Sequence, residues 1–131
     1  LVGSEMCIRD RGLAKLYGIL SSGGSRDNKK LISPQTLDLI TTQISNGPDT
    51  VLMGGDVAFG LGYMLYNKTA RVEESPKHTK GYFGHAGIGG AVAYGDKDKN
   101  LGFAFVCNKE HEIRELYKTS NEMSKALHSI I

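Results

Sequence analysis

Apolar residues in the first part of the chain recur at spacings of three, four and seven, which is the period of one helix face. The stripe of the first predicted helix consists of Leu13, Leu16, Tyr17 and Leu20. Gly23 and Gly24 follow this stripe directly and predict where the helix ends. The polar residues 25–30 then predict a connector.

A second helix is predicted to begin at Ser33 and Pro34, because serine is a favoured N-cap and proline suits the first helical position. The apolar positions of this helix are Leu37, Ile40 and Ile44. The turn-forming residues 46–48, with the sequence Asn-Gly-Pro, are expected to end it.

The second part of the chain changes to a period of two, which is typical of strands. Large side chains alternate over residues 59–65, and residues 91–94 and 101–107 form two further apolar segments. Residues 71–80 are polar and include a proline, so they predict a loop or an irregular hairpin. The helical period then returns and predicts a long amphipathic helix over 110–131.

These elements predict an α/β fold of the α+β type, with an antiparallel sheet flanked by helices. A short polar turn joins 91–94 to 101–107, and strands joined so closely run antiparallel. We expect these two strands and 59–65 to form one sheet. The helix over 110–131 is expected to pack across one face of that sheet, because its apolar stripe and the alternating strands supply the two halves of a core.

Composition and charge argue against several classes of function. The chain has 131 residues, 40% of them hydrophobic, and a formal net charge of +2, which is too balanced for a nucleic-acid-binding surface. No apolar run approaches the ~20 residues of a membrane-spanning helix. Two cysteines cannot form a disulfide framework or a zinc site by themselves, and the four histidines lack metal-ligand spacing. We therefore expect no metal, cofactor, nucleic-acid partner or membrane segment in this chain.

The first ten residues, Leu-Val-Gly-Ser-Glu-Met-Cys-Ile-Arg-Asp, resemble the conceptual translation of a sequencing adapter. We therefore expect residues 1–10 to be non-native and to have no defined packing partner. The alternative is a native segment without a recognisable role. On the adapter interpretation, residues 11–131 are the C-terminal part of a single domain whose gene product extends upstream, so the compartment of the protein stays open.

Glycines are concentrated in residues 84–90, with the sequence Gly-His-Ala-Gly-Ile-Gly-Gly. Such a run can hold a phosphate when a helix N-terminus follows it, but here a predicted strand follows. Two interpretations remain from the residues alone. The run is either a tight bend between strands with His85 as a solvated loop residue, or a place where the backbone passes close to a substrate.

Several segments together resemble the C-terminal end of the serine β-lactamase and penicillin-binding-protein-like family, in particular its class C-related branch with esterases and animal β-lactamase-domain proteins. The segments are 13–17, 31–37, 59–63, 83–90 and 101–109, in the order in which that family has them. The resemblance covers about 11–131 and implies the C-terminal portion of a β-lactamase/transpeptidase-like fold.

The resemblance implies acyl transfer to a serine nucleophile, followed by hydrolysis of a small-molecule or peptide acyl substrate. The third motif of the family is present as His85-Ala86-Gly87. By the family pattern, His85 donates a hydrogen bond at the catalytic centre, and the backbone N–H of Ile88 binds the oxyanion. Gly84, Ala86 and Gly87 are the implied substrate-binding positions. Ala86 stands where a threonine or serine hydroxyl would hold a substrate carboxylate, which argues against β-lactams and leaves ester, thioester or peptide substrates.

The first two motifs of the family, Ser-x-x-Lys and Tyr-x-Asn or Ser-x-Asn, are absent from this chain, so we expect it to be inactive alone. Two functions stay open for the full-length protein. It is either a serine hydrolase acting on ester, peptide or β-lactam-type substrates, or an inactive member of the same fold that acts as a binding or assembly module. A free-standing α+β binding domain is a third interpretation. Intact upstream motifs would favour the enzyme.

Overall fold

The computed structural model describes residues 2–51, 55–67, 79–87, 89–109, 112, 115 and 117–131, and of residues 2–8 it describes only the backbone. The strands of its larger sheet are β3 (Ser45–Pro48), β4 (Asp56–Phe59), β5 (Met64–Leu65), β6 (Tyr82–Ala86), β7 (Val92–Asp96) and β8 (Leu101–Phe105). Its helices are α1 (Val2–Ser21), α2 (Pro34–Ile40) and α3 (Lys118–His128). A separate hairpin, β1 (Ser25–Arg26) and β2 (Lys29–Lys30), follows α1.

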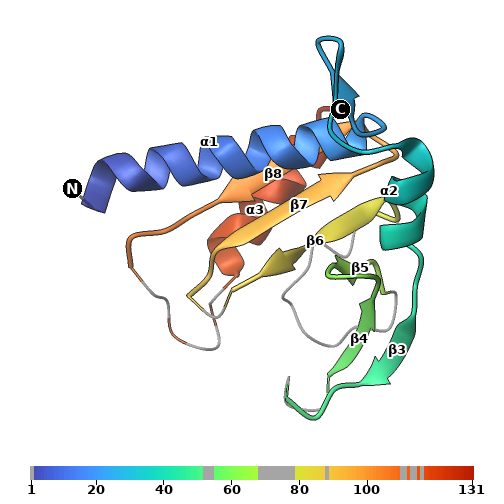
Figure 1. Cartoon of the computed structure of the whole chain (residues 1–131). Helices are drawn as coiled ribbons and strands as arrows, with labels where there is room; N and C mark the ends of the chain where they lie inside the picture. Colours follow the sequence, from blue (N-terminus) through green and yellow to red (C-terminus); the bar gives the residue numbers. More distant parts are fainter. Residues whose placement is uncertain are drawn as a thin grey trace.

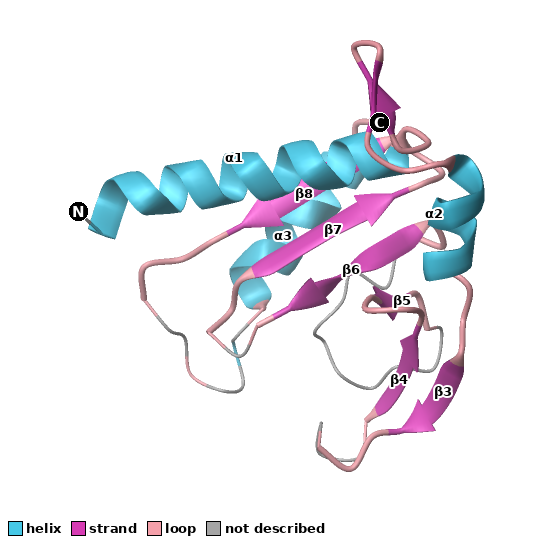
Figure 2. Ribbon diagram, viewed as in Figure 1, coloured by secondary structure: helices cyan, strands magenta, loops and turns pink. Residues whose placement is uncertain are grey.

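The six strands of the larger sheet lie in chain order, so each pairs antiparallel with the next along the chain (Figures 1 and 2). Strand β6 pairs with β7 over its whole length, with His85 opposite Ala93. Strand β7 pairs in the same way with β8, with Gly95 opposite Gly102. The predicted antiparallel sheet is therefore confirmed, and it is larger than the sequence predicted.

Side chains alternate between the two faces of this sheet and build a core on each face. Helix α3 covers one face, where the buried cluster comprises Val57, Met64, Tyr82, Val92, Tyr94, Phe103 and Tyr117. Helices α1 and α2 cover the other, where it comprises Tyr17, Leu20, Leu37, Ala58, Leu65 and Phe83. Figure 1 shows α1 crossing β7 and β8 in front of the sheet, with α3 behind it. The expected packing of the last helix against the sheet is confirmed.

Glycines allow α1 to lie directly against β8. A Cβ atom at Gly102 would overlap the carbonyl oxygen of Ala14 and the backbone of Gly18, both on α1. The hydroxyl of Ser21, at the end of the helix, lies 2.7 Å from the carbonyl oxygens of both Tyr17 and Leu101, which share its one hydrogen. Close backbone contact and this bridge together fix the position of α1 on the sheet.

The prediction of one strand over 59–65 is wrong. Strand β4 ends at Phe59, and the chain turns back before β5, with the Gly60 N–H donating to the Tyr63 carbonyl at 2.9 Å. Gly62 has a φ of +85°, a conformation that favours glycine. The glycines that alternate with large residues in this segment therefore serve a turn rather than a strand.

The second helix is shorter than predicted. Ser33 caps its N-terminus as expected, with its side chain accepting a hydrogen bond from the Thr36 N–H at 3.0 Å. The helix ends at Ile40, however, and does not reach Ile44. The Ile44 N–H donates instead to the Phe59 carbonyl at 2.8 Å, so the pairing of this segment with β4 replaces the last helical turn.

The last helix also begins later than predicted. Glu112 is not helical, Glu115 lies in a single tight turn closed by the Glu112 carbonyl, and α3 starts at Lys118. The rest of 110–116, and residues 71–78 of the expected loop, lie outside the described residues. The connector 25–30 forms a hairpin, because Asp27 and Asn28 adopt the positive φ angles (51° and 61°) of a tight two-residue turn.

The segment expected to be non-native continues α1 at the level of the backbone, since the helix begins at Val2. The side chains that would show whether this segment packs lie outside the described residues. Its non-native origin stays a prediction.

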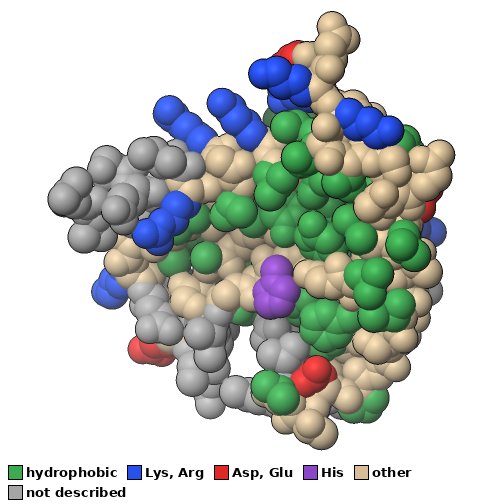
Figure 3. Space-filling view, viewed as in Figure 1, with side chains coloured by type: hydrophobic (Ala, Val, Ile, Leu, Met, Phe, Trp, Pro, Cys, Tyr) green, Lys and Arg blue, Asp and Glu red, His purple; other side chains and the backbone are tan. Residues whose placement is uncertain are grey.

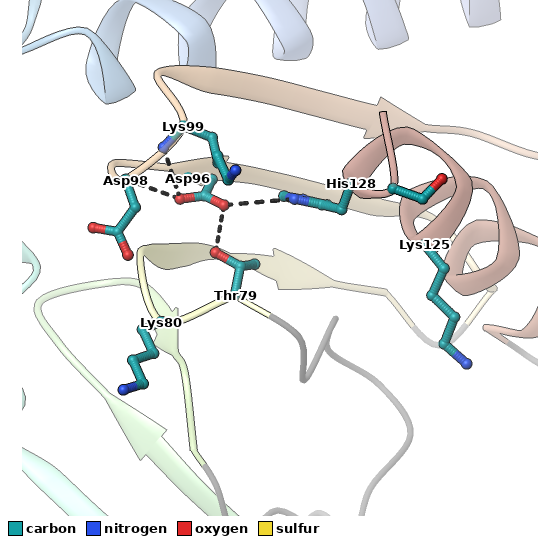
Figure 4. A pocket seen from close by; sticks show the side chains of 8 residues that line it. Thr79, Lys80, Asp96, Asp98, Lys99, Lys125 and His128 are labelled. Atoms are coloured by element: carbon teal, nitrogen blue, oxygen red, sulfur yellow. Dashed lines mark hydrogen bonds and ion pairs between the residues drawn. The ribbon is translucent and has the colours of Figure 1, made fainter. Parts of the chain in front are cut away.

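A polar cluster joins the end of β7 to α3 (Figure 4). Asp96 is fully buried, and its Oδ1 accepts hydrogen bonds from the backbone N–H groups of Asp98 (2.9 Å) and Lys99 (3.3 Å). Its Oδ2 accepts a hydrogen bond from the Thr79 hydroxyl and lies 3.8 Å from Nδ1 of His128 on α3. Asp96 thus holds the β7–β8 turn, the segment before β6 and α3 together.

The cluster continues along α3 through Tyr94. The Tyr94 hydroxyl lies 3.1 Å from Nε2 of His128 and 2.6 Å from the Ser124 hydroxyl. Burial raises the pKa of Tyr94 to about 12, and the nearby Asp96 carboxylate contributes to the shift. The phenol therefore stays protonated at neutral pH. Tyr94 and Ser124 are inaccessible to solvent, and their contacts fasten α3 to β7.

We predict that Gly102→Ala lowers the free energy of unfolding by about 2–3 kcal/mol, because the new methyl group forces α1 away from β8. Gly12→Ala is the matched control. A Cβ at Gly12 meets nothing within 4 Å, and alanine is the better helix former, so this change raises the free energy of unfolding by about 1 kcal/mol. Urea denaturation of both variants measures the difference. Equal stability of the two would contradict the contact described above.

We also predict that Asp96→Asn lowers the free energy of unfolding by about 1–3 kcal/mol, because one acceptor oxygen of a buried, fully bonded carboxylate becomes a donor. Asp98→Asn changes an exposed side chain of the same turn and should alter stability by less than about 0.5 kcal/mol. Thermal denaturation compares the two variants. A larger loss for Asp98→Asn would show that the turn, rather than the buried carboxylate, holds the cluster.

Candidate active site

Gly84, His85, Ala86 and Gly87 lie at or directly after the C-terminal end of β6, where one edge of the strand has no pairing partner among the described residues. Strand β7 accompanies β6 as far as Ala86, and the Gly87 N–H extends the pairing by donating to the Ala91 carbonyl at 2.8 Å. Strand β5 pairs with β6 only at Phe83 and Gly84. In the described part of the chain, no strand therefore borders His85 and Ala86 on that side. An open strand edge of this kind offers backbone donors and acceptors to an extended ligand.

His85 is exposed, and it lies opposite Ala93 on the face of the sheet that carries α1 and α2. On this face a histidine side chain reaches the surface among hydrophobic side chains (Figure 3). The His85 Nδ1 lies 2.8 Å from the Ala86 carbonyl oxygen, and because that oxygen only accepts, Nδ1 carries the hydrogen. In the neutral ring Nε2 is then the acceptor, and in the charged ring it becomes a second donor. The side chain is suited to exchange a proton or a hydrogen bond with a bound molecule.

The chain beyond Gly87 forms a tight turn that is held from several directions. The Gly87 carbonyl accepts hydrogen bonds from the Gly90 N–H and from the Tyr117 hydroxyl, both at 2.9 Å. The Cys107 thiol donates to the Gly89 carbonyl at 3.0 Å. Gly90 adopts a φ of +89°, which lets the chain return into β7. The glycine-rich run thus belongs to β6 as far as Ala86 and then turns back toward β7, and these hydrogen bonds anchor the turn.

The two glycines that flank His85 and Ala86 differ in their surroundings. A Cβ at Gly84 would overlap the Ala93 carbonyl oxygen and the Tyr94 backbone, so Gly84 permits the β6–β7 pairing. A Cβ at Gly87 would meet only the Ala91 carbonyl oxygen, at 3.9 Å, so the space beside exposed Gly87 is open. Gly87 is the position of this pair where a bound molecule can approach the backbone.

The two other positions that the sequence predicted for the site are Ala86 and Ile88. The side chain of Ala86 packs against the core on the α3 face, so it offers no polar group to a ligand. Ile88 lies outside the described residues, and the role of its amide stays a prediction. Sequence reasoning missed Tyr117 and Cys107, because a tyrosine in an apolar helical stripe and a cysteine at the end of a strand both resemble ordinary core residues.

An open pocket of about 550 Å³ lies at the opposite end of β6, next to the Asp96 cluster (Figure 4). Thr79, Lys80, Lys125 and His128 are among the residues that line it. The rise along a strand places the two ends of β6 about 13 Å apart, so this pocket is separate from the end that carries His85.

Within the described ranges, no three or more His, Cys, Asp or Glu residues gather to hold a metal ion. None of the described helices is long and apolar enough to cross a membrane.

Comparisons with known proteins identify the family and the fold. The sequence matches the Beta-lactamase family over residues 11–126. Among solved structures, a penicillin-binding-protein homologue from Caulobacter crescentus is 33% identical, with a TM-score of 0.67 over 77% of this chain and 26% of its own. A family VIII carboxylesterase is 25% identical, with a TM-score of 0.69 over 83% of this chain and 31% of its own.

A third structure, EstA from Arthrobacter nitroguajacolicus Rue61a, supports the fold alone, at 20% identity and a TM-score of 0.65 over 90% of this chain and 32% of its own. The search of curated proteins found no match. This chain spans about a quarter to a third of the length of the three solved structures. The chain belongs to the β-lactamase family, in which it is related to carboxylesterases and penicillin-binding-protein homologues, and its sheet and helices are part of the β-lactamase/transpeptidase fold.

Proposed function

We propose that the full-length protein is a serine hydrolase that forms an acyl-enzyme with small ester or peptide substrates, and that this chain supplies the oxyanion side of its active site. The observation that carries the proposal is the edge of β6 at His85 and Ala86, which no described strand borders and which continues into the anchored turn at Gly87. Membership of the β-lactamase family and the similarity to a carboxylesterase support the choice of acyl transfer.

The proposed mechanism places the negative charge of the tetrahedral intermediate at the open edge. Along an antiparallel strand, successive amides point to opposite sides, and the Gly87 amide is engaged by β7. The next amide, that of Ile88, is therefore the proposed oxyanion donor. Because Gly87 has no side chain, a substrate carbonyl can come within hydrogen-bonding distance of the backbone there.

The two positions before Gly87 set the proposed chemistry of the substrate. His85 supplies a hydrogen bond or a proton to the substrate or its leaving group. Ala86 lacks a hydroxyl, and its methyl group packs toward the core, so the site has no group at this position for a substrate carboxylate. Uncharged acyl groups, as in esters and thioesters, therefore fit the site better than carboxylate-bearing β-lactams.

The experiment that tests this function uses the full-length protein. We expect a fluorophosphonate probe to label the wild type and an ester such as p-nitrophenyl butyrate to be hydrolysed. Gly87→Val should lower kcat by about 10²–10³-fold, because its branched side chain blocks access to the neighbouring donor. The thermal midpoint should change little, since a Cβ at Gly87 has open space around it.

Gly89→Val is the matched control for Gly87→Val. A Cβ at Gly89 meets nothing within 4 Å, and this residue lies in the same turn but is not adjacent to Ala86. We expect it to keep at least about half of the wild-type kcat. Absence of both labelling and turnover in the wild type would favour the inactive binding module. Wild-type kcat/KM in Gly87→Val would show that the glycines form only a bend.

We further predict that His85→Ala lowers kcat by about 10–100-fold with little change in thermal midpoint, because an exposed acid–base group is removed. His85→Gln separates the two roles of this side chain, since its amide donates a hydrogen bond but carries no exchangeable charge. Recovery by glutamine would assign His85 to hydrogen bonding, and its absence to proton transfer. Steady-state kinetics as a function of pH measures both variants, and an unchanged kcat in both would remove His85 from the site.

A further inference from the structure

Tyr117 reaches the candidate site from the far side of the sheet. It precedes α3 directly, is only 8% exposed, and belongs to the buried cluster on the α3 face. Its hydroxyl donates a hydrogen bond to the Gly87 carbonyl at 2.9 Å. Because the ring is enclosed by the core, the hydroxyl is held in a fixed place and not on a mobile surface side chain.

The Gly87 carbonyl is constrained by two donors from different parts of the chain. The Gly90 N–H approaches it from within the turn, and the Tyr117 hydroxyl approaches it from the α3 layer. A carbonyl oxygen has two acceptor sites, so these two hydrogen bonds occupy both. The direction of this carbonyl is thus set by contacts that do not involve a substrate.

A fixed carbonyl has a direct consequence for the amide that follows it. The peptide group is planar and trans, so the carbonyl of one residue and the N–H of the next point in opposite directions within one plane. Any tilt of the Gly87 carbonyl would turn the following N–H by the same angle. Hydrogen bonds accepted by a carbonyl also polarise its peptide group and make the N–H a stronger donor.

We propose that Tyr117 is a positioning residue of the active site, which orients and polarises the peptide group between Gly87 and the oxyanion donor. This inference rests on the proposed function, because it gives Tyr117 a role in stabilising the charge of the tetrahedral intermediate. Tyr117 touches no substrate, and it acts through the Gly87 carbonyl. Its contribution is therefore felt in the transition state and not in the binding of the uncharged substrate.

Two neighbouring side chains provide matched controls. Tyr82 belongs to the same buried cluster, but its hydroxyl has no hydrogen-bond partner among the described residues. Cys107 anchors the same turn through the Gly89 carbonyl, which belongs to a different peptide group. Tyr82→Phe thus removes a buried phenol hydroxyl that makes no hydrogen bond to a described residue. Cys107→Ala removes a hydrogen bond that anchors the turn but leaves the hydrogen bonds of the Gly87 carbonyl in place.

The test compares Tyr117→Phe with these controls in the full-length protein. We expect Tyr117→Phe to lower kcat by about 10–100-fold, less than the loss of a whole oxyanion donor, with KM within about 3-fold of the wild type. A phenylboronic acid, which forms a tetrahedral adduct with a serine nucleophile, should bind more weakly by about the same factor. Tyr82→Phe and Cys107→Ala should stay within about 3-fold of the wild type in kcat. Replacement of Tyr117 by 3-fluorotyrosine, which keeps the hydroxyl, should restore kcat.

Each other outcome overturns the inference in a distinguishable way. A lower thermal midpoint in Tyr117→Phe with wild-type kcat would make Tyr117 an anchor of α3 only, and the proposed function would stand. An equal loss of kcat in Cys107→Ala would assign the effect to the turn as a whole and not to the Gly87 peptide group. A wild-type protein that neither reacts with fluorophosphonate nor hydrolyses esters would overturn the proposed function and this role with it.

Discussion

The backbone pairing of β6 with β7 is the interaction on which the rest of the structure depends. Gly84 permits it, because any side chain there would overlap the Ala93 carbonyl and Tyr94. The pairing continues beyond the strand through the hydrogen bond between Gly87 and Ala91. It fixes the face to which each side chain of β6 points, and it engages only one edge of the strand. On the other edge, no described strand pairs with His85 and Ala86, where the sequence places its candidate chemistry.

Helix α3 is tied to both ends of this strand pair by polar contacts. At one end the Tyr117 hydroxyl binds the Gly87 carbonyl. At the other, His128 faces the Asp96 carboxylate and the Tyr94 hydroxyl. The apolar core between these contacts is nondirectional and would tolerate a small slide of the helix, whereas hydrogen bonds at both ends do not. These contacts therefore hold the helix in a fixed position on its face of the sheet.

Local signals in the sequence predicted the parts of the fold that are decided locally. The glycines after α1 and the cap at Ser33 act through nearby backbone groups, and both were found where the sequence placed them. The hydrogen bond between Ile44 and Phe59 depends on strand pairing that exists only after the chain has folded. The apolar spacing in the sequence does not register this pairing, so it predicted a helix that continues past Ile40. The prediction of one strand over 59–65 failed for a related reason. Its large residues alternate as in a strand, but its glycines decide the path of the chain, which turns back between β4 and β5.

The candidate site was predictable only in part, for the same physical reason. His85 and the adjacent glycines are consecutive, so a motif of the sequence could identify them. Tyr117 lies thirty residues from Gly87 and joins it through one hydroxyl, which composition and periodicity cannot distinguish from a core phenol such as Tyr82. A backbone donor has no side chain that evolution can change, so its direction is adjusted only through the groups that hold its peptide plane. In an enzyme that relies on such a donor, buried residues that never contact the substrate must therefore hold the donor in its catalytic orientation.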